Sequence, residues 1–250
     1  MSEMLRVLER GYQLIWREGR AEHALEGLGP DFEWVVPEHP EGGLRRGSEA
    51  VIEFFREWSA QFDELEVDWE LREVSPDYAL AVVTTRGRGR SSGAPAEMRF
   101  AQVWTWRDGR FVRMVQYYDA DEALHAATVA AATAAYGSGN FEAVIPYLAE
   151  DVVWEEDPEW PDGQTWHGHD GVRRSFRERL ESTAITAEID ELIVRGDRVL
   201  SLMSWTAEGQ GSGAVGVLRP GVIYEFGDEL VQTVRFFIDQ ERARAAFEAA

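Results

Sequence analysis

The sequence contains no cysteine among its 250 residues. This absence excludes disulfide bonds, thiol nucleophiles and metal sites with cysteine ligands. No run of about 18 apolar residues occurs, so we expect no membrane-spanning helix. The first residues carry charges within their apolar stripe and have no cleavage site of small residues. We therefore expect no signal peptide and a cytoplasmic location.

Basic residues are scarce, with 25 Lys and Arg against 46 Asp and Glu, and the formal net charge is −21. Phosphate backbones and anionic lipid surfaces repel such a chain. We therefore expect neither a nucleic acid nor a membrane as a partner. The hydrophobic content of 44% and the ten tryptophans support a substantial core.

The second half of the chain repeats the first at an offset near 120 residues. The segment 31–34, Asp-Phe-Glu-Trp, matches 151–154, Asp-Val-Val-Trp, and a Pro-Glu-x-Pro-acid-Gly pattern occurs at 37–42 and at 158–163. The last apolar segments match as 115–118 and 234–237, an offset of 119. A period this long indicates two domains rather than a solenoid. We predict one domain at 1–120 and the other at 121–250.

Each copy has the same predicted order of elements. Helices are expected at 3–18, 21–28 and 48–62 in the first copy and at 122–137, 141–149 and 169–182 in the second. Four alternating apolar segments close each copy, which predicts an α+β fold with a mostly antiparallel sheet. Both faces of the last strand carry large apolar residues. We expect the helices of each copy to cover one face and the sister sheet to cover the other.

The order helix-helix-strand-helix-sheet, with Tyr/Trp-x-x-Gly before the second helix and DGRFVRMVQYYDADEAL at the end of the first copy, resembles the SnoaL-like polyketide cyclase and ketosteroid isomerase superfamily. The resemblance covers both halves of the chain. It implies two tandem cone-shaped barrels of the nuclear-transport-factor-2-like fold, each with three helices on a curved sheet that holds a small, largely apolar ligand. Members often pair through their sheets, so it also implies an intramolecular pseudo-dimer and leaves room for a further homodimer.

The same resemblance gives the second copy a candidate base. Ketosteroid isomerases use a carboxylate base, and two neutral donors hold the enolate oxygen. The base position falls on Asp157 or Glu156, but Ala132 and a position near Val222 occupy the places of the donors. If one copy is catalytic, we expect the second, with Asp157 or Glu156 as base and Arg235 orienting the substrate.

The first copy has candidate donors but no candidate base, the reverse of the second copy. The resemblance places Tyr12 and Gln102 at the donor positions, but Val36 at the base position. Cyclases of the superfamily carry an aspartate on the last strand, where this copy has Gln116, which is no base at neutral pH. Enolate chemistry by the standard set is therefore not expected in either copy.

His167 and His169 form an H-x-H pair beside several aspartates. The pair has three interpretations: a helix cap within a surface loop, a general acid or base, and a metal site. The first copy has Arg46 and Ser48 at the matching positions, and Ser48 suits a helix N-cap. We therefore favour the cap and surface-loop interpretation, and predict no metal and no cofactor.

The remaining candidates are aromatic and amide side chains expected to line the pockets. The predicted ligand-binding residues are Tyr12, Trp16, Trp34, Gln102, Gln116 and Tyr118 in the first copy, and Tyr136, Trp154 and Phe237 in the second. We expect a SnoaL-like protein that binds a polyketide- or steroid-like metabolite, with carboxylate-based isomerase, cyclase or hydrolase chemistry left open. The alternative is a module without catalysis that binds a ligand or another protein.

Overall fold

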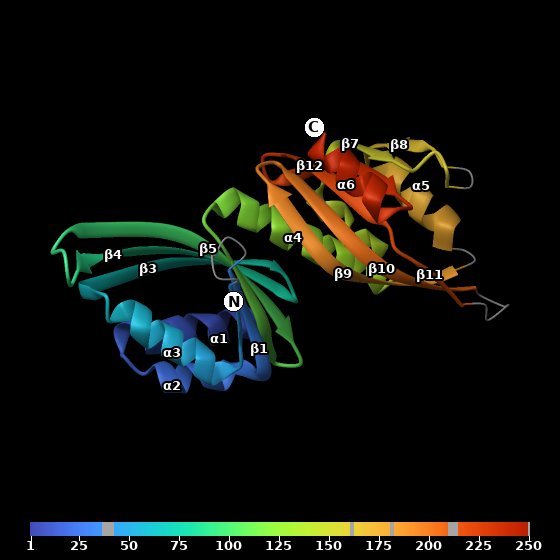
Figure 1. The fold of residues 1–250 in the computed structure, drawn as a ribbon. Coiled ribbons are helices and arrows are strands. Elements are labelled where there is room, and N and C mark those ends of the chain that lie inside the picture. Colours follow the sequence, from blue (N-terminus) through green and yellow to red (C-terminus); the bar gives the residue numbers. More distant parts are fainter. Residues whose placement is uncertain (37–42, 161–162, 181–182, 210–214, 250) are drawn as a thin grey trace. The chain divides into compact units, whose positions relative to one another are not determined.

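The computed structural model describes residues 1–36, 43–160, 163–180, 183–209 and 215–249. The chain divides into two compact units, Met1–Ala127 and Thr128–Ala250. The division falls within helix α4 (Ala120–Gly137), whereas the sequence places a boundary after residue 120. Each unit contains helices and one mostly antiparallel sheet (Figure 1), which confirms the α+β class in two tandem copies.

The helices of the first unit lie close to the predicted ranges. They are α1 (Glu3–Tyr12), the π-helical turn η1 (Gln13–Arg17), α2 (Ala21–Ala24), the 3-10 turn η2 (Leu25–Gly27) and α3 (Ser48–Ser59). Helix α1 begins after Ser2, whose hydroxyl accepts a hydrogen bond from the Leu5 amide at 3.3 Å. It buries Met4, Leu8 and Tyr12, which recur every four residues and share one face.

The first sheet has six strands in the order β2-β1-β6-β5-β4-β3. The strands are β1 (Leu28–Val36), β2 (Gly43–Arg46), β3 (Phe62–Ser75), β4 (Tyr78–Gly89), β5 (Pro95–Arg107) and β6 (Arg110–Tyr117). Only the β1–β6 pair is parallel among the described strands of this unit. Alternate residues of β1, Phe32, Trp34 and Val36, point into the core beneath α1 and α3.

The second unit repeats this arrangement. After α4 come the 3-10 turns η3 (Phe141–Ala143) and η4 (Ile145–Tyr147), β7 (Leu148–Glu155), β8 (Thr165–His167), α5 (Gly168–Leu180), β9 (Thr183–Arg195), β10 (Arg198–Gly209), β11 (Val215–Leu218), β12 (Gly221–Gly227), β13 (Leu230–Phe237) and α6 (Gln240–Glu248). The strand order is β11-β10-β12-β13-β7-β8, and β9 pairs with β10. The β7–β13 pair is parallel, as β1–β6 is in the first unit. Two 3-10 turns therefore replace the helix predicted at 141–149.

In each unit, a helix packs on part of the second face of the sheet. In the first unit, Ala123, Leu124 and Ala127 of α4 pack on the face opposite α1 and α3. In the second, Ala243 and Phe247 of α6 pack on the face opposite α5. We expected the sister sheet to cover these faces; within each unit, the helix that follows the last strand packs on an apolar part of them. The apolar second face therefore gives no support to the predicted pseudo-dimer, which stays a prediction.

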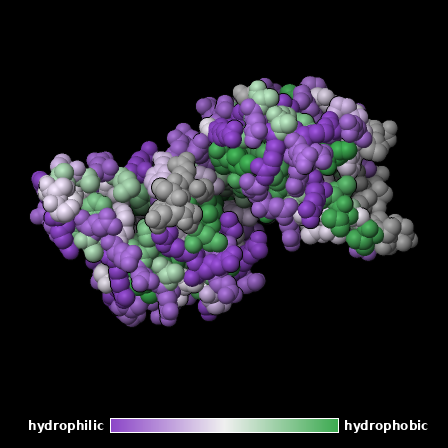
Figure 2. Space-filling model, in the orientation of Figure 1, coloured by the Kyte–Doolittle hydropathy of each residue, from purple (hydrophilic) through white to green (hydrophobic). Residues whose placement is uncertain are grey.

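The surface visible in Figure 2 is mostly hydrophilic, with smaller apolar areas. Ion pairs join exposed charged side chains of the first unit, such as Arg86 with Asp68 at 3.0 Å and Arg90 with Asp63 at 3.0 Å. Among the described residues, no helix is long and apolar enough to cross a membrane.

Candidate functional site

The interior of the first unit holds a cavity of about 320 Å³. Residues from both ends of β1 line it, from Leu28 to Val36, so the cavity follows this strand beneath α1 and α3. Its volume lies at the lower end of the range of about 300–1,000 Å³ that is usual for small-molecule sites. The first unit therefore has room for a small organic ligand.

Aromatic rings form much of the cavity wall. Trp34 on β1 meets Phe54 of α3 edge to face, with ring centres 4.5 Å apart, and Trp16 meets Phe55 in the same way at 5.4 Å. Trp58 lines the cavity one turn further along α3. Phe54 and Phe55 were not among the predicted pocket residues, although helical spacing after Val51 places them on one face with Trp58.

Three neutral polar side chains form a hydrogen-bonded chain in the cavity wall. The Tyr12 hydroxyl donates to Gln102 Oε1, and Gln102 Nε2 donates to Gln116 Oε1 at 3.3 Å. The donor group of Gln116, its Nε2, makes no hydrogen bond to the part of the chain that the structure describes. The indole Nε1 of Trp34, which lines the same cavity, is buried and also has no partner among those residues.

These polar groups are uncharged. Burial raises the pKa of the Tyr12 hydroxyl well above its ordinary value, and the neighbouring Trp104 indole offsets part of this rise. Tyr12 is therefore a neutral phenol at physiological pH. Within the described ranges, no Asp, Glu, Lys, Arg or His side chain lines the cavity, and Val36, which the resemblance places at the base position, is one of the lining residues. The cavity can hold a ligand by apolar contact and neutral hydrogen bonds.

The structure brings together all the ligand-binding candidates of the first copy. The residues Tyr12, Trp16, Trp34, Gln102, Gln116 and Tyr118 line this one cavity. Tyr118 lies at its outer edge, since 49% of its surface is exposed. The sequence therefore indicated the composition of this pocket, although we expected any chemistry in the other copy.

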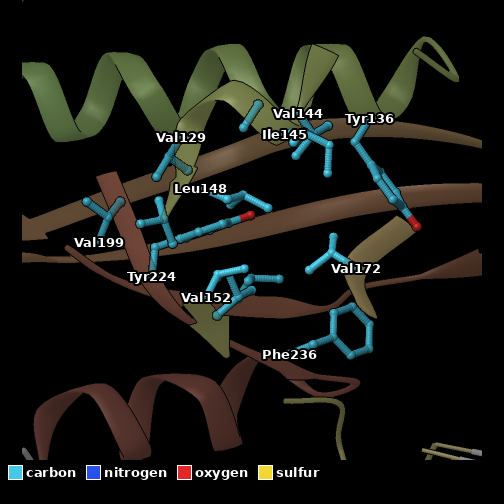
Figure 3. Packing of buried hydrophobic residues seen from close by; sticks show 14 of the residues in the cluster. Val129, Tyr136, Val144, Ile145, Leu148, Val152, Val172, Val199, Tyr224 and Phe236 are labelled. Atoms are coloured by element: carbon cyan, nitrogen blue, oxygen red, sulfur yellow. The ribbon is translucent and has the colours of Figure 1, made fainter. Parts of the chain in front are cut away.

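The corresponding interior of the second unit is filled by side chains. Figure 3 shows the cluster, in which Val129, Tyr136, Val172 and Phe236 converge from helices and strands. Trp205 stacks on Tyr136 with ring centres 5.4 Å apart and lies 5.2 Å from Phe236. The two voids lined by the predicted Tyr136 and Trp154 measure only about 30 and 20 Å³. Neither void accommodates an organic ligand.

The strand register corrects our alignment of the two copies. Met114 pairs with Trp34 across β6 and β1, and Val234 pairs with Trp154 across β13 and β7. Val234 lies 120 residues after Met114, so the last strands align at this offset and not at the predicted 119. A shift of one residue moves every side chain of a strand to the opposite face.

The counterpart of Gln116 is therefore Phe236, which fills the interior, and not Arg235. Arg235 and Phe237 lie on the other face of the second sheet, beneath α6. Arg235 Nη2 donates to Glu225 at 2.6 Å, and Phe237 packs in the cluster around Phe247. Neither predicted residue lines either of the voids in the second unit.

Asp157, the predicted base, holds three segments of the second unit together. Its buried carboxylate accepts hydrogen bonds from the backbone amides of Glu159 at 3.0 Å and Ile238 at 3.1 Å. Arg242 Nη1 lies 3.2 Å from the same carboxylate. These contacts join the loop after β7 to the end of β13 and to α6.

Glu156, the alternative base, is also buried and engaged. It accepts a hydrogen bond from Ser175 Oγ of α5 at 2.8 Å and another from the Gln164 amide at 3.2 Å. It borders the void of about 20 Å³. Both carboxylates thus have protein partners, and their catalytic assignment stays a prediction.

The two histidines lie where a strand passes into a helix. His167 ends β8 and is exposed, and His169 Nε2 lies 3.0 Å from the backbone oxygen of Leu148. In the first unit Gly47, not Ser48, occupies the N-cap position, so our capping interpretation of this position was wrong. No group of three or more His, Asp or Glu side chains within the described ranges could hold a metal ion.

The model of the SnoaL-like domain family matches the chain twice, at residues 8–114 and 129–234. A solved NTF2-like protein of unknown function from Burkholderia pseudomallei is 25% identical, with a TM-score of 0.42, over 51% of this chain and 99% of its own. TerC, co-crystallised with polyporic acid, is 27% identical over 47% of this chain and 92% of its own, with a TM-score of 0.41.

An NTF2-like protein from Burkholderia xenovorans is 23% identical over 49% of this chain and 95% of its own, with a TM-score of 0.41. The chain matches no curated protein.

Proposed function

Because the chain belongs to the SnoaL-like domain family, with two consecutive copies of its domain, we propose that the first copy binds a neutral, largely apolar metabolite and that the second copy is structural. The observation that carries this proposal is the difference between the two interiors. The first encloses about 320 Å³ beside three connected polar groups, and the second is filled. The SnoaL-like fold supports a small-molecule-binding domain.

The polar groups of the cavity favour a ligand with a hydrogen-bond acceptor. Gln102 donates to the Oε1 of Gln116, which leaves the Nε2 of Gln116 as a donor for the ligand. The buried Nε1 of Trp34 is a second donor, with no partner among the residues that the structure describes. An unpaired buried donor is costly, so an acceptor on the ligand stabilises the complex. A ketone or quinone on a fused-ring, polyketide- or steroid-like body has this chemistry.

The composition of the cavity favours binding over acid-base catalysis. No carboxylate or imidazole lines the described wall, and Tyr12 stays neutral because burial raises its pKa. General acid-base catalysis needs a group whose pKa lies near the working pH. We therefore assign Tyr12, Gln102 and Gln116 to ligand orientation and assign proton transfer to none of them.

The proposal is tested with Prodan, a neutral naphthyl ketone whose fluorescence shifts to the blue in apolar surroundings. We expect the parent protein to bind one Prodan. The variant Gln116→Phe, which copies the second unit, should bind it at least about tenfold more weakly, because the added ring fills the cavity and removes the donor. Tyr224→Phe, inside the filled second unit, is the matched control and should leave binding unchanged. Equal binding by the parent and Gln116→Phe would contradict the proposal.

A further inference from the structure

The cavity reaches both ends of the parallel β1–β6 pair. Leu28 and Phe111 pair at one end, and Val36 and the exposed Tyr118 lie at the other. All four residues line the cavity. Tyr118 therefore marks one place where the cavity meets solvent. The Leu28 end lies at the other end of the strand pair.

A surface groove of about 650 Å³ lies outside the Leu28 end, along α1, α2 and η2. Four residues, Val7, Gly11, Ala24 and Gly27, line both the groove and the cavity. All four are small or short, and each is only partly buried. The rest of the groove is mostly polar and is lined by Glu3, Arg6, Arg10, Leu14, Arg20, His23, Glu26 and Gly109. A thin boundary of small residues therefore separates an apolar cavity from a polar groove.

The two glycines of this boundary have different surroundings. A Cβ added at Gly27 would lie 2.8 Å from Val7 Cγ1, so Gly27 allows η2 to approach α1 closely. A Cβ added at Gly11, one turn beyond Val7, would meet nothing within 4 Å, and Gly11 does not have the positive φ that favours glycine. Gly11 thus stands beside open space.

Gly11 lowers the stability of its helix, and no packing contact requires a glycine there. It lies inside the helical stretch formed by α1 and η1, where glycine is less favourable than alanine because it loses more backbone freedom on folding. Neither a close contact nor a strained backbone requires it. At the offset of 120 residues its counterpart in the second unit is Ala131, which is buried.

We propose that the gap between α1 and η2 at Gly11 is a second opening of the cavity, and that residue 11 sets the size of the molecules that pass between the cavity and the polar groove. That the ligand uses this opening rests on the proposed function, whereas the opening itself does not. A cavity open at both ends suits an elongated ligand with an apolar body in the cavity and a polar end in the groove.

The absence of cysteine makes the opening directly measurable. Leu8 lines the cavity beside Gly11, so Leu8→Cys places the chain's one thiol there. Its reaction rate with methyl methanethiosulfonate, a small neutral reagent, is compared in the parent background and after Gly11→Ala, Gly11→Leu and Tyr118→Trp. Val67→Cys, buried in the same unit but away from the cavity, gives the background rate from local opening of the fold. Circular dichroism checks that each variant is folded.

We expect Gly11→Leu to slow the reaction at position 8 by about tenfold or more, Gly11→Ala to slow it less, and Tyr118→Trp to change it by less than about twofold. The rate at position 67 should not respond to residue 11. A rate at position 8 that responds to Tyr118→Trp and not to Gly11→Leu would overturn the proposal, because the reagent would then use the other end.

The association rate of Prodan separates this inference from the proposed function. If residue 11 controls access, Gly11→Leu lowers that rate along with the thiol reaction. A slower thiol reaction with an unchanged Prodan rate would overturn the role of the opening in ligand access. Failure of the parent protein to bind Prodan would count against the proposed function, and the thiol rates would still decide whether the opening exists.

Discussion

Replacing Asp157 with alanine removes a buried carboxylate that joins three segments of the second unit. Its oxygens accept the amide protons of Glu159 at 3.0 Å and of Ile238 at 3.1 Å, and Arg242 lies 3.2 Å away. If these contacts are structural, Asp157→Ala should destabilise the second unit and leave ligand binding by the first unit unchanged.

The two backbone hydrogen bonds supply most of the expected loss. A hydrogen bond to a charged group contributes about 1.5–3 kcal/mol, and an orphaned buried amide adds a desolvation cost. Arg242 adds little, because its side chain is 42% exposed and it also pairs with Glu159 at 3.0 Å. We therefore expect Asp157→Ala to lower the free energy of unfolding of the second unit by about 3–5 kcal/mol, and Asp157→Asn by about half as much because its amide oxygen still accepts one bond.

Urea unfolding followed by circular dichroism measures this loss, with hydrogen exchange of the backbone amides in the β10–β12 ladder reporting on the second unit by itself. Glu159→Ala is the matched control. Glu159 contributes an exposed ion pair to the same arginine, so Glu159→Ala should lower the free energy of unfolding by less than about 1 kcal/mol. The reasoning is refuted if Asp157→Ala unfolds like the parent protein. Loss of a catalytic activity at unchanged stability would instead support Asp157 as the base predicted from the sequence.

Two further predictions follow from buried aromatic side chains. Burial raises the pKa of Tyr117 and Tyr224 to about 12, above the ordinary value of 10.0, so stability from keeping them neutral is present below pH 10 and lost as the pH rises toward about 12. Ultraviolet titration should show that, between pH 10 and about 12, both tyrosines stay protonated in the folded protein, whereas the tyrosines of the unfolded protein have lost their protons. Titration of the folded and unfolded proteins over the same pH range would contradict this. Trp205→Ala removes the ring between Tyr136 and Phe236 and should cost about 3–5 kcal/mol while opening the second interior. Prodan binding should then rise from one site to two, and a stoichiometry that stays at one would show that the interior collapses instead.

The positions of the helices and strands could be read from the sequence because they depend on local spacing. Met4, Leu8 and Tyr12 mark one face of α1, and alternation marks β1 and β3. The pocket residues Tyr12 and Gln102 were predicted from the family resemblance, which places both at donor positions, and Trp34 was predicted as an aromatic side chain of the pocket wall. The predicted offset between the last strands of the two copies was wrong by one residue. A one-residue shift between two apolar segments still matches apolar residues with apolar residues, so the sequence does not reveal it.

The sequence by itself determined that this protein is two tandem α+β copies, since the repeat preserves order, spacing and residue type along both halves. Only the tertiary structure decided which copy holds a cavity. That outcome depends on the summed volume of side chains from distant elements, such as Trp205, Tyr136 and Phe236, which meet only after folding. The structure also gave Asp157 its partners, because the amide of Ile238 lies 81 residues away along the chain. A catalytic carboxylate and a structural one can lie in the same sequence motif. Only the groups that surround them in the folded protein distinguish the two.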